Sequence, residues 1–231
     1  TTNISVLTQV GSLTDWNYGT ATYRGFIFLK TDGTLWGFGD NTYGNLGQGN
    51  TTSYSSPVQL GSATNWTNVS CSMGTTHAIN SSGQLWVVGR GAQGQQGRGN
   101  NSDTTTLNQV GSLTNWAKAI GGTYTVHYVK TDGTLWASGS GGGGRTGNNN
   151  TTNYSSPIQI GGLTTWIDGI GGYGGHYALA DGKLWGWGMN SSPQGGAGDG
   201  TTTDRNSPVQ IGSATDWQTC GHTLDRASAG F

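Results

Sequence analysis

The chain has 231 residues, a formal net charge of −1, 9% charged residues, 44 glycines, 10 tryptophans and no glutamate. Typical proteins have about 25% charged residues and about 7% glycine, so this chain is glycine-rich and poor in charge. The tryptophan content and low net charge argue against a disordered chain, and the lack of excess basic residues argues against a nucleic-acid-binding surface.

Two series of tryptophans recur at steps of 49 to 51 residues. In the first series each tryptophan ends a motif such as GSLTDW; its members are Trp16, Trp66, Trp116, Trp166 and Trp217. In the second series each tryptophan follows a leucine; its members are Trp36, Trp86, Trp136 and Trp185. Trp187 alone lies outside both series. The period predicts a single repeat domain over 1–231; its repeats are 1–50, 51–100, 101–150 and 151–200, with a partial repeat at 201–231.

The repeat at 51–100 illustrates the expected strands. Short β-favouring runs stand at 55–61, 66–70, 76–80 and 84–89, and glycine, serine and asparagine separate them. No stretch has the uninterrupted spacing of an amphipathic helix, and no run approaches the roughly 18 apolar residues of a membrane span. The repeat therefore predicts an all-β fold without membrane insertion.

A tight turn separates the third and fourth strands of each full repeat. The turn is Asp-Gly in three repeats, at Asp32-Gly33, Asp132-Gly133 and Asp181-Gly182. Asp-Gly is typical of type I′ hairpins, in which both central residues have positive φ. Four short antiparallel strands in every 50 residues describe the blade of a β-propeller, whereas a parallel β-helix would have no hairpin in each unit.

The combined pattern resembles the repeat of the regulator of chromosome condensation family. The best single match is KTDGTLWGFGDNTYGNLGQGN at 30–50. The pattern also includes G-x-x-H at 74–77, P-V-Q-L at 57–60, and D-G-x-L-W, which recurs at 32–36, 132–136 and 181–185. The resemblance implies a β-propeller, which in this family has seven blades. Because the chain offers about four and a half repeats, we expect part of a larger ring, with closure of 4–10 onto 217–231 as the alternative.

Three histidines stand near one position of successive repeats, at His77, His127 and His176. A metal site would bring all three within about 2.1 Å of one ion. Equivalent positions on packed sheets are about 10 Å apart, so we expect a repeated structural hydrogen bond and no metal site. The resemblance agrees, since the family has a histidine there.

Other polar motifs carry no recognisable chemistry. GRGAQG at 89–94 and GSGGGG at 139–144 fit a dinucleotide-binding pattern, but neither opens a helix, so both are interpreted as turns and no cofactor is expected. Asp40 and Asp199 lie in glycine-rich loops without a calcium-loop pattern.

The two cysteines, Cys71 and Cys220, are not equivalent in their repeats. A disulfide between them would have to cross the repeat array. We therefore expect both to be unpaired.

Partner-binding residues are expected where equivalent loops differ, because repeat-wide positions are explained by packing. Tyr43 stands in the first such loop, Arg90 and Arg98 in the second, and Arg145 in the third. Tyrosine and arginine are enriched at binding hot spots. These four residues are the candidate partner-binding set.

The uncharged, polar composition favours a non-enzymatic interaction module at an extracellular or virion surface, such as a phage tail fibre or a bacterial adhesin. We expect a protein or glycan partner, or other subunits of a larger assembly, and no nucleic acid. A chromatin-associated exchange factor is one alternative, although Lys and Arg total only 10 against 11 Asp. A propeller enzyme with a site built from several loops is the other.

Overall fold

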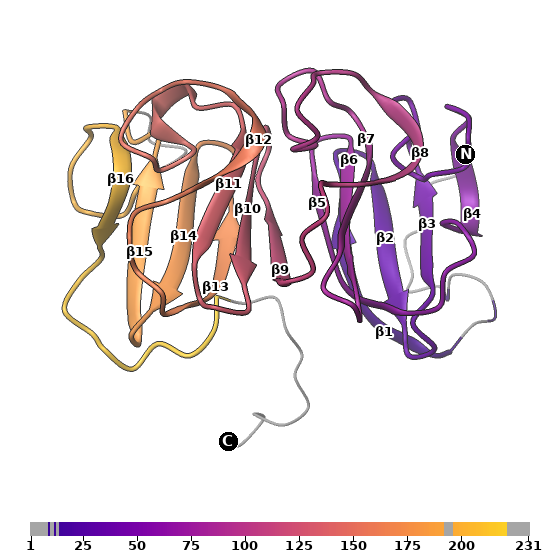
Figure 1. Ribbon diagram of the computed structural model, residues 1–231, viewed down its shortest axis with the longest axis horizontal. Helices are drawn as coiled ribbons and strands as arrows, with labels where there is room; N and C mark the ends of the chain where they lie inside the picture. Colours follow the sequence, from indigo (N-terminus) through magenta and orange to yellow (C-terminus); the bar gives the residue numbers. More distant parts are fainter. Residues whose placement is uncertain (1–8, 10–11, 13, 192–195, 221–231) are drawn as a thin grey trace.

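The computed structural model describes residue 9, residue 12, residues 14–191 and residues 196–220. Its 16 strands form four antiparallel sheets of four strands each (Figure 1). The first sheet contains β1 (Trp16–Ala21), β2 (Gly25–Lys30), β3 (Leu35–Gly39) and β4 (Tyr54–Gln59). The second contains β5 (Trp66–Ser72), β6 (Thr75–Asn80), β7 (Leu85–Gly89) and β8 (Thr104–Gln109). The third contains β9 (Trp116–Gly121), β10 (Thr125–Lys130), β11 (Leu135–Gly139) and β12 (Tyr154–Gln159). The fourth contains β13 (Trp166–Gly171), β14 (Gly175–Ala180), β15 (Lys183–Gly188) and β16 (Arg205–Gln210).

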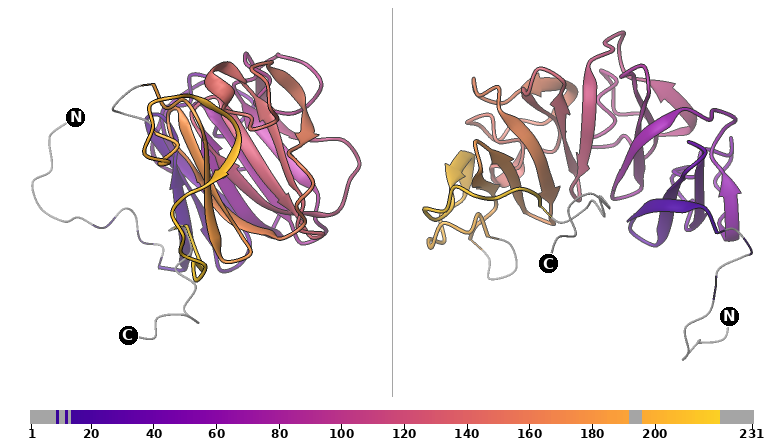
Figure 2. Two further views of the ribbon diagram at one scale, coloured as in Figure 1. Left: turned by 90° about the vertical axis from the view of Figure 1, so that its left-hand side faces the viewer. Right: turned by 90° about the horizontal axis from the view of Figure 1, so that it is seen from below.

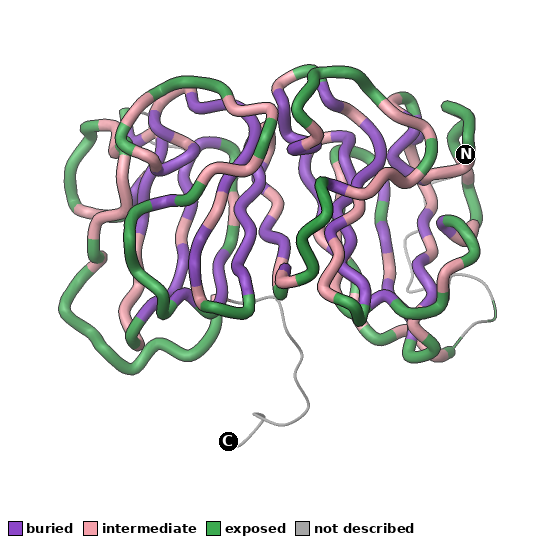
Figure 3. The backbone as a smooth tube through the Cα atoms, viewed as in Figure 1, coloured by how far each residue is buried: buried purple, intermediate pink, exposed green. Residues whose placement is uncertain are grey.

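The four sheets follow one another along an arc, as the right panel of Figure 2 shows. In every sheet the strands pair in chain order, so the first strand and the fourth strand are the two edges. Buried residues concentrate on the strands and exposed ones on the connections (Figure 3). The prediction of an all-β propeller architecture is thereby confirmed.

The sheets are offset from the sequence repeats. The predicted strand at 55–61 is present as β4, but it pairs with β3 of the preceding repeat and completes the first sheet. The strands predicted at 66–70, 76–80 and 84–89 are β5, β6 and β7 of the second sheet. The expectation that one repeat forms one complete blade is therefore wrong, because each repeat contributes its first strand to the sheet before it.

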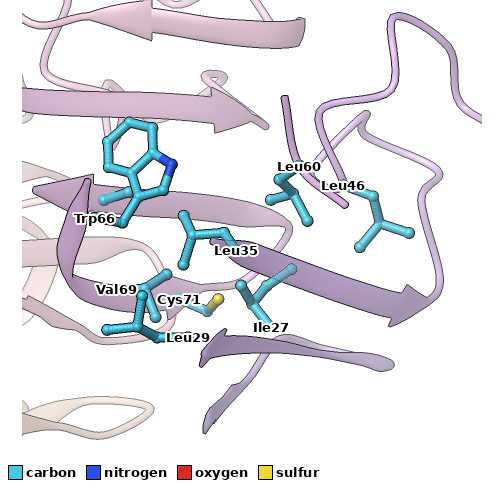
Figure 4. Close-up of a cluster of buried hydrophobic side chains, with 9 residues drawn as sticks. Ile27, Leu29, Leu35, Leu46, Leu60, Trp66, Val69 and Cys71 are labelled. Carbon is cyan, nitrogen blue, oxygen red and sulfur yellow. The ribbon is translucent and has the colours of Figure 1, made fainter. Parts of the chain in front are cut away.

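The first tryptophan series joins neighbouring sheets. Trp66, Trp116 and Trp166 are at most 5% exposed. Trp66 opens β5 yet belongs to a cluster that includes Leu35 and Leu60 of the first sheet region (Figure 4). The tryptophan backbone is fixed as well, since Trp66 N donates to the Gly33 carbonyl oxygen at 3.0 Å, and the other two members have the same bond. Each of these side chains is a wedge between two sheets.

The prediction that both tryptophan series lie in blade cores is only partly right. Trp16 and all four members of the second series are half-buried, and Trp217 is 44% exposed. No sheet of the described residues precedes Trp16 or follows Trp217, which explains their exposure. Second-series side chains instead pack edge-on against the first-series wedge of the same sheet, as for Trp86 against Trp66. Trp187, outside both series, is 1% exposed.

The hairpin turns also differ from the prediction. Only Asp181 has positive φ, so a two-residue turn with both central residues left-handed forms there and not at the other two Asp-Gly pairs. At Asp132 the loop is one residue longer, and the carboxylate accepts hydrogen bonds from the amide and hydroxyl of Thr134. Gly133 alone carries the positive φ, of 74°. This is a type I turn followed by a glycine bulge.

Gly133 gives a first testable prediction. A Cβ there would lie 2.0 Å from the Thr164 carbonyl oxygen and would disturb the bond that fixes the next wedge, Trp166. A side chain in the left-handed region costs about 1–2 kcal/mol before this clash is added. We expect Gly133→Ala to lower the free energy of unfolding by roughly 3 kcal/mol in chemical denaturation.

Two other glycines are matched controls. Gly111 has φ of 59° with nothing within 4 Å of the added Cβ, so Gly111→Ala should lose only the conformational cost of about 1 kcal/mol. Gly162 has neither constraint, so its alanine variant should be unchanged or slightly more stable. Equal losses at all three positions would contradict the interpretation.

Helix is almost absent from the described residues. It is limited to the 3₁₀ turn η1 (Gly142–Gly144), and none of the described segments forms a helix with the length and hydrophobicity that a membrane span requires.

Candidate partner-binding site

Two kinds of connection meet at one end of the four sheets, along the upper edge in Figure 1. They are the turn between the first and second strands and the long loop between the third and fourth strands. The first and third strands of a sheet run in the same direction, so the connections that follow them start at the same end. We call this end the loop face. Its turns are 22–24, 73–74, 122–124 and 172–174, and its first three long loops are 40–53, 90–103 and 140–153.

Five side chains of the loop face alternate between tyrosine and arginine. The guanidinium carbon of Arg90 lies 5.0 Å from the ring centroid of Tyr43 and 5.5 Å from that of Tyr124. The guanidinium carbon of Arg145 lies 6.0 Å from the rings of both Tyr124 and Tyr173. We call these five residues the Tyr-Arg array. It runs through loops of all four sheets, and each contact has the geometry of a cation–π interaction.

The backbone holds both arginines of the Tyr-Arg array in place. Arg90 N donates to the Gly74 carbonyl oxygen at 2.8 Å, and the Thr75 hydroxyl donates to the Arg90 carbonyl oxygen at 2.6 Å. The indole nitrogen of Trp187 donates to the Arg145 carbonyl oxygen at 3.0 Å. The side chains are half-buried and do not form ion pairs with carboxylates of the described residues. The guanidinium groups therefore have no direct ion-pair partner, although Arg145 acts on Asp204 at longer range.

An open groove of about 760 Å³ adjoins the Tyr-Arg array. The first strands of the four sheets, β1, β5, β9 and β13, form its wall, and Tyr124 and Tyr173 line its end at the loop face. Within the groove, Lys118 Nζ lies 2.8 Å from Asp168 Oδ1, so this pair contributes no net charge. The volume is within the usual range of about 300–1,000 Å³ for ligand sites.

Three of the four predicted partner-binding residues, Tyr43, Arg90 and Arg145, thus come together in the Tyr-Arg array. Arg98 does not. Its Nη1 donates to the Gln96 side-chain oxygen at 3.1 Å, and it lines a separate groove with Trp116 and Trp136. Sequence comparison missed Tyr124 and Tyr173, although each stands in the turn after the first strand of its sheet, where a tyrosine also occurs at Tyr23.

Carboxylates in the long loops bind other residues close to them in sequence and so stabilise the loop conformation. Asp40 accepts a hydrogen bond from Thr42 N, which lowers its pKa. Asp204 accepts bonds from the amides of Asn190 and Ser191; these bonds, and more weakly the charge of Arg145, lower its pKa. Asp199 pairs with Arg205. These contacts account for the acidic loop residues without calcium.

The three histidines do not form a metal site. In the strand pairing, His176 aligns with Val126 and not with His127. The His176 side chain therefore points toward the third sheet, whereas the His127 side chain points toward the fourth. Their ring centroids are 4.6 Å apart, and both contact Trp187. Across the described residues, no three His, Cys, Asp or Glu side chains are placed to hold a metal ion.

The predicted structural hydrogen bond is present only at His77, whose ring nitrogens lie 3.4 Å from the Ser72 hydroxyl and 3.5 Å from the Tyr128 hydroxyl. The ring nitrogens of His127 and His176 have no partner of normal geometry in the described part of the chain, although backbone of Arg145 lies beside His127. Burial lowers the pKa of His77 and His127 to about 3, and that of His176 well below its usual value.

Both cysteines are free thiols, as predicted. Cys71 is buried, and the amide of Cys220 donates to Asp168 Oδ2, on β13, at 3.1 Å.

Residues 32–79 match the family model described as the regulator of chromosome condensation (RCC1) repeat. The match runs from the first sheet into the second, in agreement with the offset between repeats and sheets. No curated protein sequence matched the chain. The predicted resemblance to this repeat is confirmed.

Solved RCC1-like proteins share the architecture. The chain is similar to Prp20p from Saccharomyces cerevisiae, with 15% identity and a TM-score of 0.77 over 88% of this chain and 52% of Prp20p. In yeast RCC1 (Prp20) bound to Kap60, the values are 15% and 0.76, over 88% of this chain and 50% of that one. For human WBSCR16 they are 21% and 0.74, over 93% and 60%. The chain thus spans 50–60% of the length of these proteins, and the likeness establishes the fold.

Proposed function

We propose that the chain is a non-enzymatic interaction module that binds a protein or glycan partner through the loop face. The Tyr-Arg array carries this proposal, because it gathers two guanidinium groups without a direct ion pair and three aromatic rings beside an open groove. The packing shared by all repeats does not require these side chains. Gln93 stands at the repeat position of Tyr43, and Met73 stands at the repeat position of Tyr173. Side chains that the fold does not need are available for a partner.

We place the module at an extracellular or virion surface, as part of a tail fibre or a bacterial surface protein. The support is compositional: a coat of Thr, Ser, Asn and Gly with few Lys and no Glu. Such a surface has little long-range electrostatic attraction, so contacts at a defined site must provide specificity.

The test is a binding screen of the chain against arrays of immobilised glycans and purified proteins. A variant with Tyr43, Arg90 and Arg145 changed to alanine should lose binding and keep the wild-type melting curve. The matched control is Arg98→Ala, which removes an arginine of a neighbouring loop outside the array and should bind normally. The proposal would be refuted if the chain bound none of the immobilised glycans or proteins. It would also be refuted if the triple variant bound a partner as well as the wild-type chain does.

A chromatin-associated exchange factor is the second candidate, because fold likeness to yeast Prp20p fits it equally well. The structure of Prp20p was described together with its binding to Gsp1p and histones. If this chain has the same role, it should bind Gsp1p and histones and act as an exchange factor on Gsp1p. Neither effect is expected here, since the charge is balanced and the groove contains a neutralised ion pair.

A further inference from the structure

The two arginines of the Tyr-Arg array retain free hydrogen-bonding capacity. Arg145 Nη1 lies 3.4 Å from the Ser140 hydroxyl, and Nη2 lies 2.9 Å from the Met189 sulfur, which is a weak acceptor. The tyrosine rings lie within cation–π distance of both guanidinium groups, and the described residues provide few acceptors for the guanidinium N–H groups. Planar guanidinium groups bind carboxylate, sulfate and phosphate oxygens with two parallel hydrogen bonds. The array therefore has two oxyanion-binding groups, one on each side of Tyr124.

The most exposed apolar side chains of the loop face are tyrosines, whose rings carry hydroxyl groups. Among the described residues, the exposed large apolar side chains in its turns are Tyr23, at 59%, and Tyr173, at 67%. Of the exposed aliphatic side chains, Leu113, Leu163 and Ile167 lie elsewhere, and Ile170 lies on β13 in the wall of the groove. Separate exposed tyrosine rings offer flat apolar surfaces with a polar edge, which suit the faces of sugar rings.

The adjoining groove adds hydroxyl and amide groups. Thr20, Asn68, Ser70 and Thr123 line it together with several glycines. The side-chain oxygens of Asn68 and Ser70 accept hydrogen bonds from the amides of Ala119 and Gly121, at 3.0 Å and 2.8 Å, which leaves their N–H and O–H groups to donate to sugar oxygens. A linear polymer could lie along the array with its neutral part against this wall.

We propose that the Tyr-Arg array binds an acidic polysaccharide, a linear chain of sugars that carry carboxylate or sulfate groups. Arg90 and Arg145 each hold one acidic group, and the exposed ring of Tyr173, beside Arg145, packs against a neighbouring sugar ring. This inference rests on the proposed function, because it names the class of partner for the same site.

The test measures affinity by calorimetry with four probes: a short oligomer of galacturonic acid, a sulfated galactose oligomer, the neutral galactose oligomer, and an oligo-aspartate peptide. At least one acidic sugar should bind, more weakly at high salt. Arg90→Ala and Arg145→Ala should each lower its affinity by about tenfold or more, as expected for loss of a charged hydrogen-bonded pair. The sulfated and carboxylated probes together identify which acidic group is preferred.

Two controls separate binding from folding. Arg98→Ala should leave the affinity unchanged. Arg145→Lys keeps the charge and most of the side-chain packing but loses the planar fork, so it should fold normally and still bind more weakly.

Equal affinity for the neutral sugar would overturn the inference, as would tighter array-dependent binding of oligo-aspartate, equal loss in Arg98→Ala, or no binding of either acidic sugar. None of these results decides whether the chain is an interaction module, because the screen against immobilised glycans and proteins tests that proposal separately. If the chain bound nothing in that screen, the proposed function itself would be wrong.

Discussion

Lowering the pH from about 7.5 to about 5 is expected to reduce the free energy of unfolding by up to about 6 kcal/mol. His77, His127 and His176 are buried and neutral in the folded chain, where desolvation lowers the pKa of the first two to about 3 and that of the third well below 6.5. In the unfolded chain each titrates near 6.5 and takes up a proton as the pH falls. The contribution of each histidine is therefore complete above that pH and is lost below it, by about 2 kcal/mol at pH 5.

The measurement is the urea midpoint as a function of pH between about 7.5 and 5, a window chosen because carboxylates titrate below it. His127→Ile and His176→Val introduce residues that other sheets have at the aligned positions, Ile27 and Val126. The double variant should lose about two-thirds of the pH dependence. Stability that is flat over this range in the wild-type chain, or a double variant with the wild-type slope, would show that these histidines are not buried and neutral.

Trp116→Ala is expected to destabilise the chain by about 3–5 kcal/mol, the usual cost of removing a buried tryptophan. Trp116 is 3% exposed and packs between the second and third sheets, in a cluster with Leu85 and Tyr128. Removal of the side chain leaves a cavity. The hydrogen bond from the amide of this residue to the Gly83 carbonyl oxygen holds the backbone in place, so the surrounding structure cannot close the cavity.

Trp217 is the matched control within the same tryptophan series. Its amide has the equivalent bond, to the Gly182 carbonyl oxygen, but its side chain is 44% exposed. Trp217→Ala should therefore cost less than about 1 kcal/mol in the same chemical denaturation experiment. If both substitutions have similar effects, the first series does not act as wedges between sheets.

Sequence periodicity predicted the strands well because each strand depends on local residues. The strand at 66–70 and its tryptophan follow from alternation, turn residues and a fixed spacing, and β5 begins at Trp66. Periodicity could not assign 55–61 to the correct sheet, because in sequence the strand lies closer to β5, across 60–65, than to β3, across 40–53. Hydrogen bonding to β3 decided that question.

One-residue shifts account for most of what the sequence did not reveal about the site. Tyr124 immediately precedes β10, whereas Tyr173 stands two residues before β14. An alignment of the repeats therefore does not place the two tyrosines at the same position. His176 is displaced from His127 in the same way, and since alternate residues of a strand face opposite sides, the shift brings the two rings together. Contacts of this kind depend on the facing sheet.

The offset between repeats and sheets has a consequence for how such chains change in length during evolution. Because every repeat both completes one sheet and begins the next, recombination between any two equivalent points adds or removes whole sheets and leaves no strand unpaired. The identical KTDGTLW segments at 30–36 and 130–136 are such points. Loss of residues 30–129 would join β2 to the turn before β11, and the remaining strands could still form two complete sheets. Blade number can thus vary in steps without any intermediate that exposes a broken sheet.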